Sequence, residues 1–264
     1  MKRLALIFPA LLLCTVCVFA APSPQGDTTA LMRKLDEYLL ALDGAGWSKA
    51  CGETDFIVSS VQDSVLRNAV AVKIYRHFRH SNVMGSENVA VYVFDRWFSS
   101  WQALFPSLEE YEDAEFYAFV NRQSLLGCEA PEGKFVDERG DSLSVHGKRR
   151  VSIVYFYSTS CPKCLYTSLK IKELLNNGKF RADFCAIYTG DDDMEWKKYV
   201  ASSLDVRGTC RLRVHHLRCP QESDFVTAWG VVQTPRLFLL DKNGRIVGRN
   251  LDAQALEKLL KLYC

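Results

Sequence analysis

Two cysteines separated by two residues, Cys161 and Cys164, are the side chains of this sequence best suited to covalent chemistry. They follow an apolar run over residues 151–157, which predicts a buried strand, and they begin a segment with helical apolar spacing. The N–H groups and the positive dipole end of a helix N-terminus stabilise a thiolate. Because a thiolate attacks disulfides, this placement predicts thiol–disulfide exchange. Half of a zinc site is the weaker alternative, since no second CxxC occurs beyond the apolar N-terminal run.

The first twenty residues have the pattern of an export signal. Lys2 and Arg3 precede an apolar stretch, and small residues around Ala20 form a cleavage site. We therefore expect residues 1–20 to be removed and the protein to be exported. An uncleaved membrane anchor is the first alternative, although the stretch is short for a bilayer span. A lipid anchor is less favoured, because Leu13 and Val16 stand before the cysteines of this segment where very small residues are needed.

Length and charge set broad limits on the function. The chain has 264 residues, enough for one large or two modest domains after removal of the signal. Its formal net charge of +2 is close to balanced, which argues against a nucleic-acid partner. Two of the ten cysteines lie in the signal, and an exported protein can keep disulfides among those outside the CxxC.

The first half of the mature chain, residues 27–125, is predicted to be all helical. We expect a helix capped by Asp27, a second helix along the apolar pattern of residues 56–75, and a third that begins at Ser86. The sequence Ser-Leu-Glu-Glu at residues 107–110 predicts a capping box and a further helix. The aromatic residues of this half are expected to form a core, with a partner-binding groove as the alternative.

The second half alternates strands with helices and predicts a central sheet flanked by helices. The composition shifts near residues 127–131, which marks the expected domain boundary. A hairpin is expected first, and the region after the second helix is expected to be irregular up to a short helix before Trp229. The predicted elements are a hairpin at 133–145, strands at 151–157, 184–188, 236–240 and 245–247, and helices at about 162–176, 194–202 and 252–262.

These features together resemble a thioredoxin fold. The CPKC sequence after a strand, Gln233-Thr234-Pro235 before another strand, and the Asn243-Gly244 turn occur in the order that the family has. The subgroup resembled is the exported TlpA/ResA-like thiol–disulfide oxidoreductases, over about residues 126–264. Residues 84–98 are similar to a helical domain of unknown role that precedes the thioredoxin domain in exported Bacteroidota proteins. The expected fold is therefore α/β, with an all-α N-terminal domain over residues 27–125.

The resemblance also implies roles for individual residues. Cys161 matches the exposed attacking thiol and Cys164 the buried thiol that resolves the mixed disulfide. Pro235 matches a proline that is cis in this fold and lies against the CxxC, leaving the Thr234 backbone free to pair with an incoming peptide. Between the cysteines, Pro162 and Lys163 are expected to modulate reactivity. The Lys163 charge should favour the thiolate, with a solvated lysine of little effect as the alternative.

Two positions depart from the family pattern. Thioredoxins often carry a buried acid six residues before the first cysteine, and Tyr155 stands there instead. A tyrosine is a poor base at neutral pH, so the proton of the resolving thiol must leave by water or another side chain. Ser160 replaces a frequent tryptophan, which makes the surface near Cys161 less apolar.

The stretch from Cys210 to Cys219 is the least family-like part of the second half. It contains two cysteines with His215 and His216 between them. A structural disulfide is the favoured interpretation and unrelated free thiols the next. A metal site is disfavoured, because adjacent histidines on a strand point to opposite faces.

The sequence therefore predicts an exported thiol–disulfide oxidoreductase without a bound cofactor, located in the periplasm or cell envelope. Its expected partners are envelope proteins with thiols or disulfides and a membrane electron donor, and the subgroup favours the reductive direction. The first alternative is a client-binding protein whose CxxC is vestigial or structural. A thiol peroxidase is disfavoured, because Thr159 is two rather than three residues before Cys161. A fragment from Leu126 onward is expected to fold and to reduce disulfides at close to the full-length rate.

Overall fold

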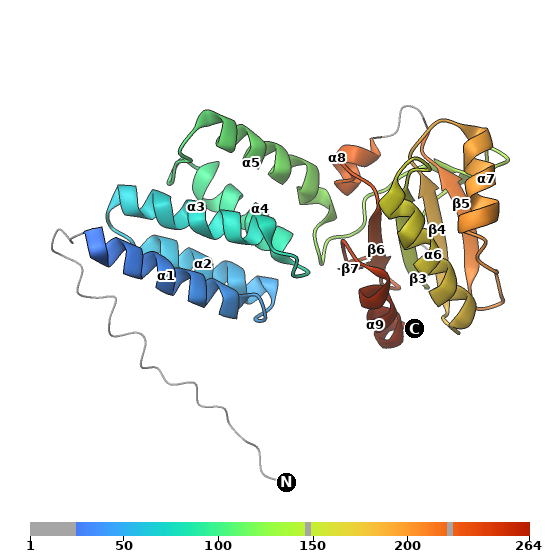
Figure 1. Ribbon diagram of the computed structural model, residues 1–264, viewed down its shortest axis with the longest axis horizontal. Coiled ribbons are helices and arrows are strands. Elements are labelled where there is room, and N and C mark those ends of the chain that lie inside the picture. Colours follow the sequence, from blue (N-terminus) through green and yellow to red (C-terminus); the bar gives the residue numbers. More distant parts are fainter. Residues whose placement is uncertain (1–24, 146–148, 221–223) are drawn as a thin grey trace, which may run out of the picture. The chain divides into compact units, whose positions relative to one another are not determined.

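The computed structural model describes residues 25–145, 149–220 and 224–264 (Figure 1). The predicted signal peptide, residues 1–20, lies outside these described residues. The chain divides into two compact units, Met1–Gly44 and Ala45–Cys264. The described part of the first unit is helix α1, Gln25–Leu42. Asp27 already lies within this helix, so the helix start expected at that residue is wrong.

The second unit begins with helices separated by short connections (Figure 1). Helix α4 contacts α2, α3 and α5 and so lies at the centre of this helical region. The helices are α2 (Trp47–Ser60), α3 (Ser64–His80), α4 (Ser86–Val93) and α5 (Leu108–Asn121), with a π-helical turn at Phe94–Phe98 and a 3₁₀ turn at Arg122–Ser124. The all-helical prediction for this part is confirmed.

Two boundaries in this region differ from the expected ones. The apolar pattern over residues 56–75 is divided between α2 and α3, because Asp63 caps α3 by accepting a hydrogen bond from the Leu66 N–H at 2.7 Å. Ser86 begins α4 as expected, but the helix was expected to carry Trp101 and instead continues only as the π-helical turn. Trp101 lies beyond that turn, with a φ of 58° and a largely exposed side chain. The cap at Ser107 is confirmed, since its hydroxyl accepts from the Glu110 N–H at 3.2 Å.

The described residues after 125 contain a seven-stranded sheet of order β2-β1-β5-β4-β3-β6-β7. Strands β3, β4 and β5 are parallel, while β6 and β7 and the β1–β2 hairpin are antiparallel. The strands are β1 (Phe135–Val136), β2 (Ser142–Leu143), β3 (Val151–Tyr157), β4 (Ala182–Tyr188), β5 (Arg213–Arg218), β6 (Arg236–Leu240) and β7 (Ile246–Gly248). The central sheet predicted from the alternation of elements is confirmed, and it is mixed, as the thioredoxin fold implied.

Strand β5 corrects the expectation of an irregular stretch. It pairs with β4 along its length and with β1 at Arg218. A six-residue strand spans roughly 20 Å, and it separates Cys210 from Cys219. A disulfide needs Cα atoms within about 7 Å, so the bond favoured between these two cysteines is wrong, and Cys210 is a free thiol.

Helices cover the two faces of the sheet and enclose two cores. On one face, side chains of β3 such as Ile153 and Tyr155 pack against buried residues of α6 (Pro162–Asn177), α7 (Asp193–Ser203) and α9 (Ala253–Tyr263). On the other face, Val154 and Phe156 pack with Trp229 of α8 (Phe225–Trp229) and with the chain that follows Leu126. The period-two alternation along β3 therefore supplies both cores.

Within the described residues, no helix combines the length and the apolar character that crossing a bilayer requires.

Candidate active site

Cys161 lies at the point where β3 has ended and α6 begins. It is the N-cap of α6, and Pro162 occupies the first helical position, where its missing N–H costs nothing. The Cys164 backbone N–H donates to the Cys161 sulfur at 3.2 Å. A partly exposed sulfur thus takes the place that a Ser or Asp oxygen usually has at a helix start.

Hydrogen bonds set the protonation of Cys161. Partial burial raises the pKa of this thiol, but hydrogen bonds outweigh burial and hold the pKa below its ordinary value. They come from the Cys164 side chain and N–H, from the Thr234 side chain and from the Lys163 backbone N–H. Lys163 therefore acts here through its backbone, and its side chain, like that of Pro162, is exposed to solvent.

Cys164 lies in the opposite environment. Its side chain is fully buried, one turn inside α6. Burial, followed by the hydrogen bond with Cys161, raises its pKa to about 11. The two thiols are coupled, and the pair keeps its proton on Cys164 while the Cys161 sulfur is the one that ionises.

The chain before β6 closes the site from a distant part of the sequence. The Thr234–Pro235 peptide bond is cis, as the family resemblance implied. The Cys161 thiol donates to the Thr234 carbonyl oxygen at 3.5 Å. The two motifs singled out in the sequence, more than seventy residues apart, therefore meet at one sulfur.

A chain of hydroxyl groups lies beneath Cys164. Tyr155, which stands where many thioredoxins have an acid, donates to the Cys164 carbonyl oxygen at 3.0 Å. Its hydroxyl is also 3.1 Å from Ser168 Oγ, which is 3.0 Å from the Tyr199 hydroxyl. Burial raises the pKa of Tyr155 far above neutral pH. Ser168 and Tyr199 were not expected here, because contact across α6 and α7 leaves no mark in their local sequence.

Among the residues that the structure describes, the other cysteines and histidines form no metal-binding group. Cys51, in the helical region, and Cys128, after it, are both free thiols. In the parts of the chain that the structure describes, no three His, Cys, Asp or Glu side chains are grouped as a metal site requires.

Comparison with protein families matches residues 141–263 to the thioredoxin-like domain. The match includes the CxxC, the cis proline and every strand from β2 onward. Residues 141–263 form a thioredoxin-like domain. The helical region before it lies outside the match.

Solved structures extend the likeness in fold beyond the thioredoxin-like domain. A thioredoxin-like protein from Bacteroides caccae is 13% identical with a TM-score of 0.64, and the match covers 89% of this chain and 84% of that one. Since it covers 89%, the shared fold includes much of the helical region.

Two shorter neighbours correspond to about half of the chain. The thioredoxin domain of a thiol-disulfide oxidoreductase from Bacteroides vulgatus is 19% identical over 52% of this chain and 96% of its own, with a TM-score of 0.45. A thiol-disulfide oxidoreductase from Bacteroides fragilis is 19% identical over 52% and 99%, with a TM-score of 0.43. No curated protein sequence matches the chain.

Proposed function

We propose that this protein is a thiol–disulfide oxidoreductase in which Cys161 attacks and Cys164 resolves. The observation that carries the proposal is the division of the pair into an accessible thiol of lowered pKa and a buried thiol of raised pKa. A nucleophile must be ionised and reachable, whereas a resolving thiol must wait until the first bond has formed.

In the reductive direction, the Cys161 thiolate attacks one sulfur of a client disulfide and displaces the other as a thiolate. The Cys161–client mixed disulfide is then attacked by Cys164 once that thiol has lost its proton. The client leaves as a dithiol after gaining two electrons and two protons. The pair is left as a Cys161–Cys164 disulfide, which a second dithiol must reduce before the next turnover.

We further propose that the clients are proteins of the periplasm or cell envelope and that a membrane electron donor regenerates the dithiol. The export pattern of residues 1–20 and the resemblance to the TlpA/ResA-like subgroup support this location. The subgroup also favours the reductive direction. A measured reduction potential near −270 mV fits a reductase, while a value near −120 mV identifies an oxidant.

The first prediction tests the two roles by trapping. Cells that produce Cys164→Ser should accumulate mixed disulfides between Cys161 and client proteins, because the resolving thiol is gone. Cys161→Ser should trap none, since the remaining thiol is buried and protonated at neutral pH. The measurement is non-reducing electrophoresis of acid-quenched cells, followed by mass spectrometry of the bands.

Cys264→Ser is a matched control, because Cys264 is an exposed thiol at the end of α9. It should behave as the wild type does. Equal trapping by Cys161→Ser and Cys164→Ser would reverse or remove the assigned roles. Trapping by neither variant, together with inert purified protein in a dithiol-reduction assay, would favour the client-binding alternative.

A further inference from the structure

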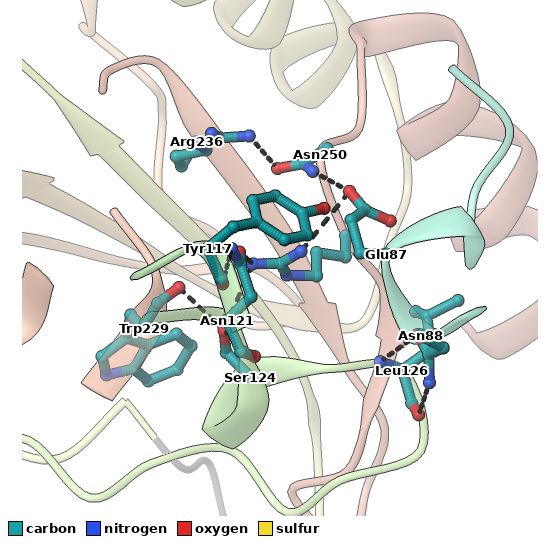
Figure 2. Close-up of polar contacts among 10 residues, drawn as sticks. Glu87, Asn88, Tyr117, Asn121, Ser124, Leu126, Trp229, Arg236 and Asn250 are labelled. Atoms are coloured by element: carbon teal, nitrogen blue, oxygen red, sulfur yellow. Dashed lines mark hydrogen bonds and ion pairs between the residues drawn. The ribbon is translucent and has the colours of Figure 1, made fainter. Parts of the chain in front are cut away.

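A buried ion pair joins the helical region to the thioredoxin-like domain (Figure 2). Arg249 follows β7, and its side chain is only 1% exposed. Its Nη1 lies 3.4 Å from Oε1 of Glu87, which is in the first turn of α4 and is itself mostly buried. A guanidinium buried away from water needs a counter-ion, and the Glu87 carboxylate of α4 supplies it to Arg249.

Two neutral side chains also contact Arg249. Its Nη2 donates to Asn121 Oδ1 and to Ser124 Oγ, the latter at 3.4 Å, and both partners come from the end of the helical region. The Ser124 hydroxyl donates in turn to the carbonyl oxygen of Trp229 at 2.9 Å. Figure 2 shows these contacts as one connected group. The helical region is therefore fixed to the sheet domain by several buried polar contacts.

Two hydrogen bonds lead from the Glu87 carboxylate toward the active site. Asn250 donates from Nδ2 to Glu87 Oε1, and its Oδ1 accepts from Nη1 of Arg236. Asn250 adopts a left-handed conformation with a φ of 52°, which aims its amide between the two charged groups. Arg236 is the residue directly after Pro235 and the first residue of β6.

We propose that Glu87 and Asn250 are positioning residues that hold the Thr234–Pro235 segment against Cys161. This inference rests on the proposed function, since it concerns the reactivity of the same sulfur. The path runs from Glu87 through Asn250 to Arg236, and the Thr234 carbonyl two residues earlier is 3.5 Å from the Cys161 sulfur. The helical region would then be part of the support of the active site.

The expected consequence follows from the groups that lower the pKa of Cys161. The Thr234 side chain is one of them, through a hydrogen bond to the sulfur that is distinct from the carbonyl contact. If Arg236 loses its anchor, the segment before β6 gains freedom, and the hydrogen bond from the Thr234 side chain to the sulfur is formed less of the time. The pKa of Cys161 should then rise toward its ordinary value, and less thiolate should be present at neutral pH.

The test is the pH profile of Cys161 alkylation by iodoacetamide in the fully reduced full-length protein, followed by mass spectrometry of the Cys161 peptide. Asn250→Gly keeps the left-handed backbone accessible and leaves the Glu87–Arg249 pair in place, so it removes only the path to Arg236. The midpoint of its alkylation profile should rise by about 0.5 pH unit. At pH values below the midpoint, its alkylation rate should therefore be about threefold lower than that of the wild type. Glu87→Gln should raise the midpoint as well and also lower stability.

Glu110→Gln is the matched control. Glu110 pairs with Arg76 at 2.6 Å, and both residues belong to the helical region and lie at its surface. This variant should keep the wild-type midpoint. If Glu87→Gln does not fold, Asn250→Gly alone decides. An unchanged midpoint in folded Asn250→Gly, or an equal shift in Glu110→Gln, overturns the inference.

The readout also separates this inference from the proposed function. Alkylation of one cysteine requires no client and no electron donor. A shifted midpoint in a protein that exchanges no disulfides supports the positioning role and refutes the oxidoreductase. Normal trapping of clients together with an unshifted midpoint supports the oxidoreductase and refutes the positioning role.

Discussion

Tyr155 stabilises the resolving cysteine without being able to take its proton. Its hydroxyl donates to the Cys164 carbonyl oxygen and contacts Ser168, and burial raises its pKa well beyond neutral pH. The acid that many thioredoxins have at this position would ionise in the working range, but Tyr155 stays protonated there. The thiol of Cys164, with a pKa of about 11, must therefore lose its proton to water or to the leaving client.

Tyr155→Phe tests this reading of the site. The change should lower the free energy of unfolding by about 1–3 kcal/mol, because Ser168 and the Cys164 carbonyl lose a buried partner. The shape of the pH–rate profile for single-turnover disulfide reduction should stay as in the wild type, since no group that titrates near neutrality has been removed. Urea denaturation and stopped-flow kinetics measure the two effects. Loss of a titration step from the profile would mean that Tyr155 does move the proton.

The sequence predicted only those residues of the site that carry a local pattern. Cys161 and Cys164 lie within four residues of one another, and Pro235 has a recognisable context before β6. Ser168, Tyr199 and Glu87 were not found, because each acts through a contact with a residue far away along the chain. Such contacts depend on how the helices pack on the sheet, and the spacing of residues in the local sequence does not predict that packing.

At the scale of elements, the strands that were predicted well are those with continuous apolar runs. The expected bounds of β3 and β6 agree with the structure, and both strands are almost entirely buried. Strand β5 was missed because Arg213, His215, His216 and Arg218 make its sequence polar. Its conformation depends on pairing with β4 and β1, so the neighbouring strands determine it more than its own side chains do.

A buried ion pair at the start of the parallel strands shows how such polar sequences are accommodated. Arg150, just before β3, lies 2.9 Å from Asp183 of β4, and both side chains are less than 10% exposed. The same guanidinium donates to the carbonyl oxygens of Ala182, at 3.2 Å, and of Arg211, just before β5. One cation thus connects the beginnings of three neighbouring strands.

Asp183→Asn should lower the free energy of unfolding by about 3 kcal/mol, because it leaves the Arg150 charge buried without its counter-ion. The double change Arg150→Met with Asp183→Leu should recover much of the loss, since apolar side chains need no counter-ion. Glu257→Gln, which breaks the exposed Lys261–Glu257 pair of α9, is the control and should cost about 0.5 kcal/mol or less. Urea denaturation compares the three proteins. A small effect of Asp183→Asn would show that water or other groups already compensate the guanidinium.

At the scale of the whole molecule, the helical region and the thioredoxin-like domain have separate cores but share contacts. The core formed by β3, α6, α7 and α9 consists wholly of residues after 150. The connection between the two parts is also tied down, because the Asn88 side chain donates to the Leu126 carbonyl at 3.0 Å and accepts from the Leu126 N–H at 3.2 Å. Chain contacts accordingly group Ala45–Cys264 as one compact unit. The boundary expected near residue 126 stays a prediction.

A fragment of residues 126–264 tests how far the domain is independent. It should fold, because it keeps its core and the hydrogen bonds of residues 127–130 with β7 and the preceding turn, such as Gly127 N–H to Ile246 O at 2.8 Å. Its urea midpoint should be lower than that of the full chain, since α8 loses its contact with α5 and Arg249 loses Glu87. Reduction of insulin, expected from sequence alone at close to the full-length rate, should instead slow about threefold if Glu87 positions the site.

The full-length Asn250→Gly variant is the comparison that gives this fragment its meaning. Fragment and variant should share a raised alkylation midpoint for Cys161, because both lack the path from Glu87 to Arg236. A fragment that matches the full-length rate and midpoint would make the helical region a separate module with a role in choosing clients. An unfolded fragment would instead make the two parts one cooperative unit, in which residues 45–125 are needed to build the site at all.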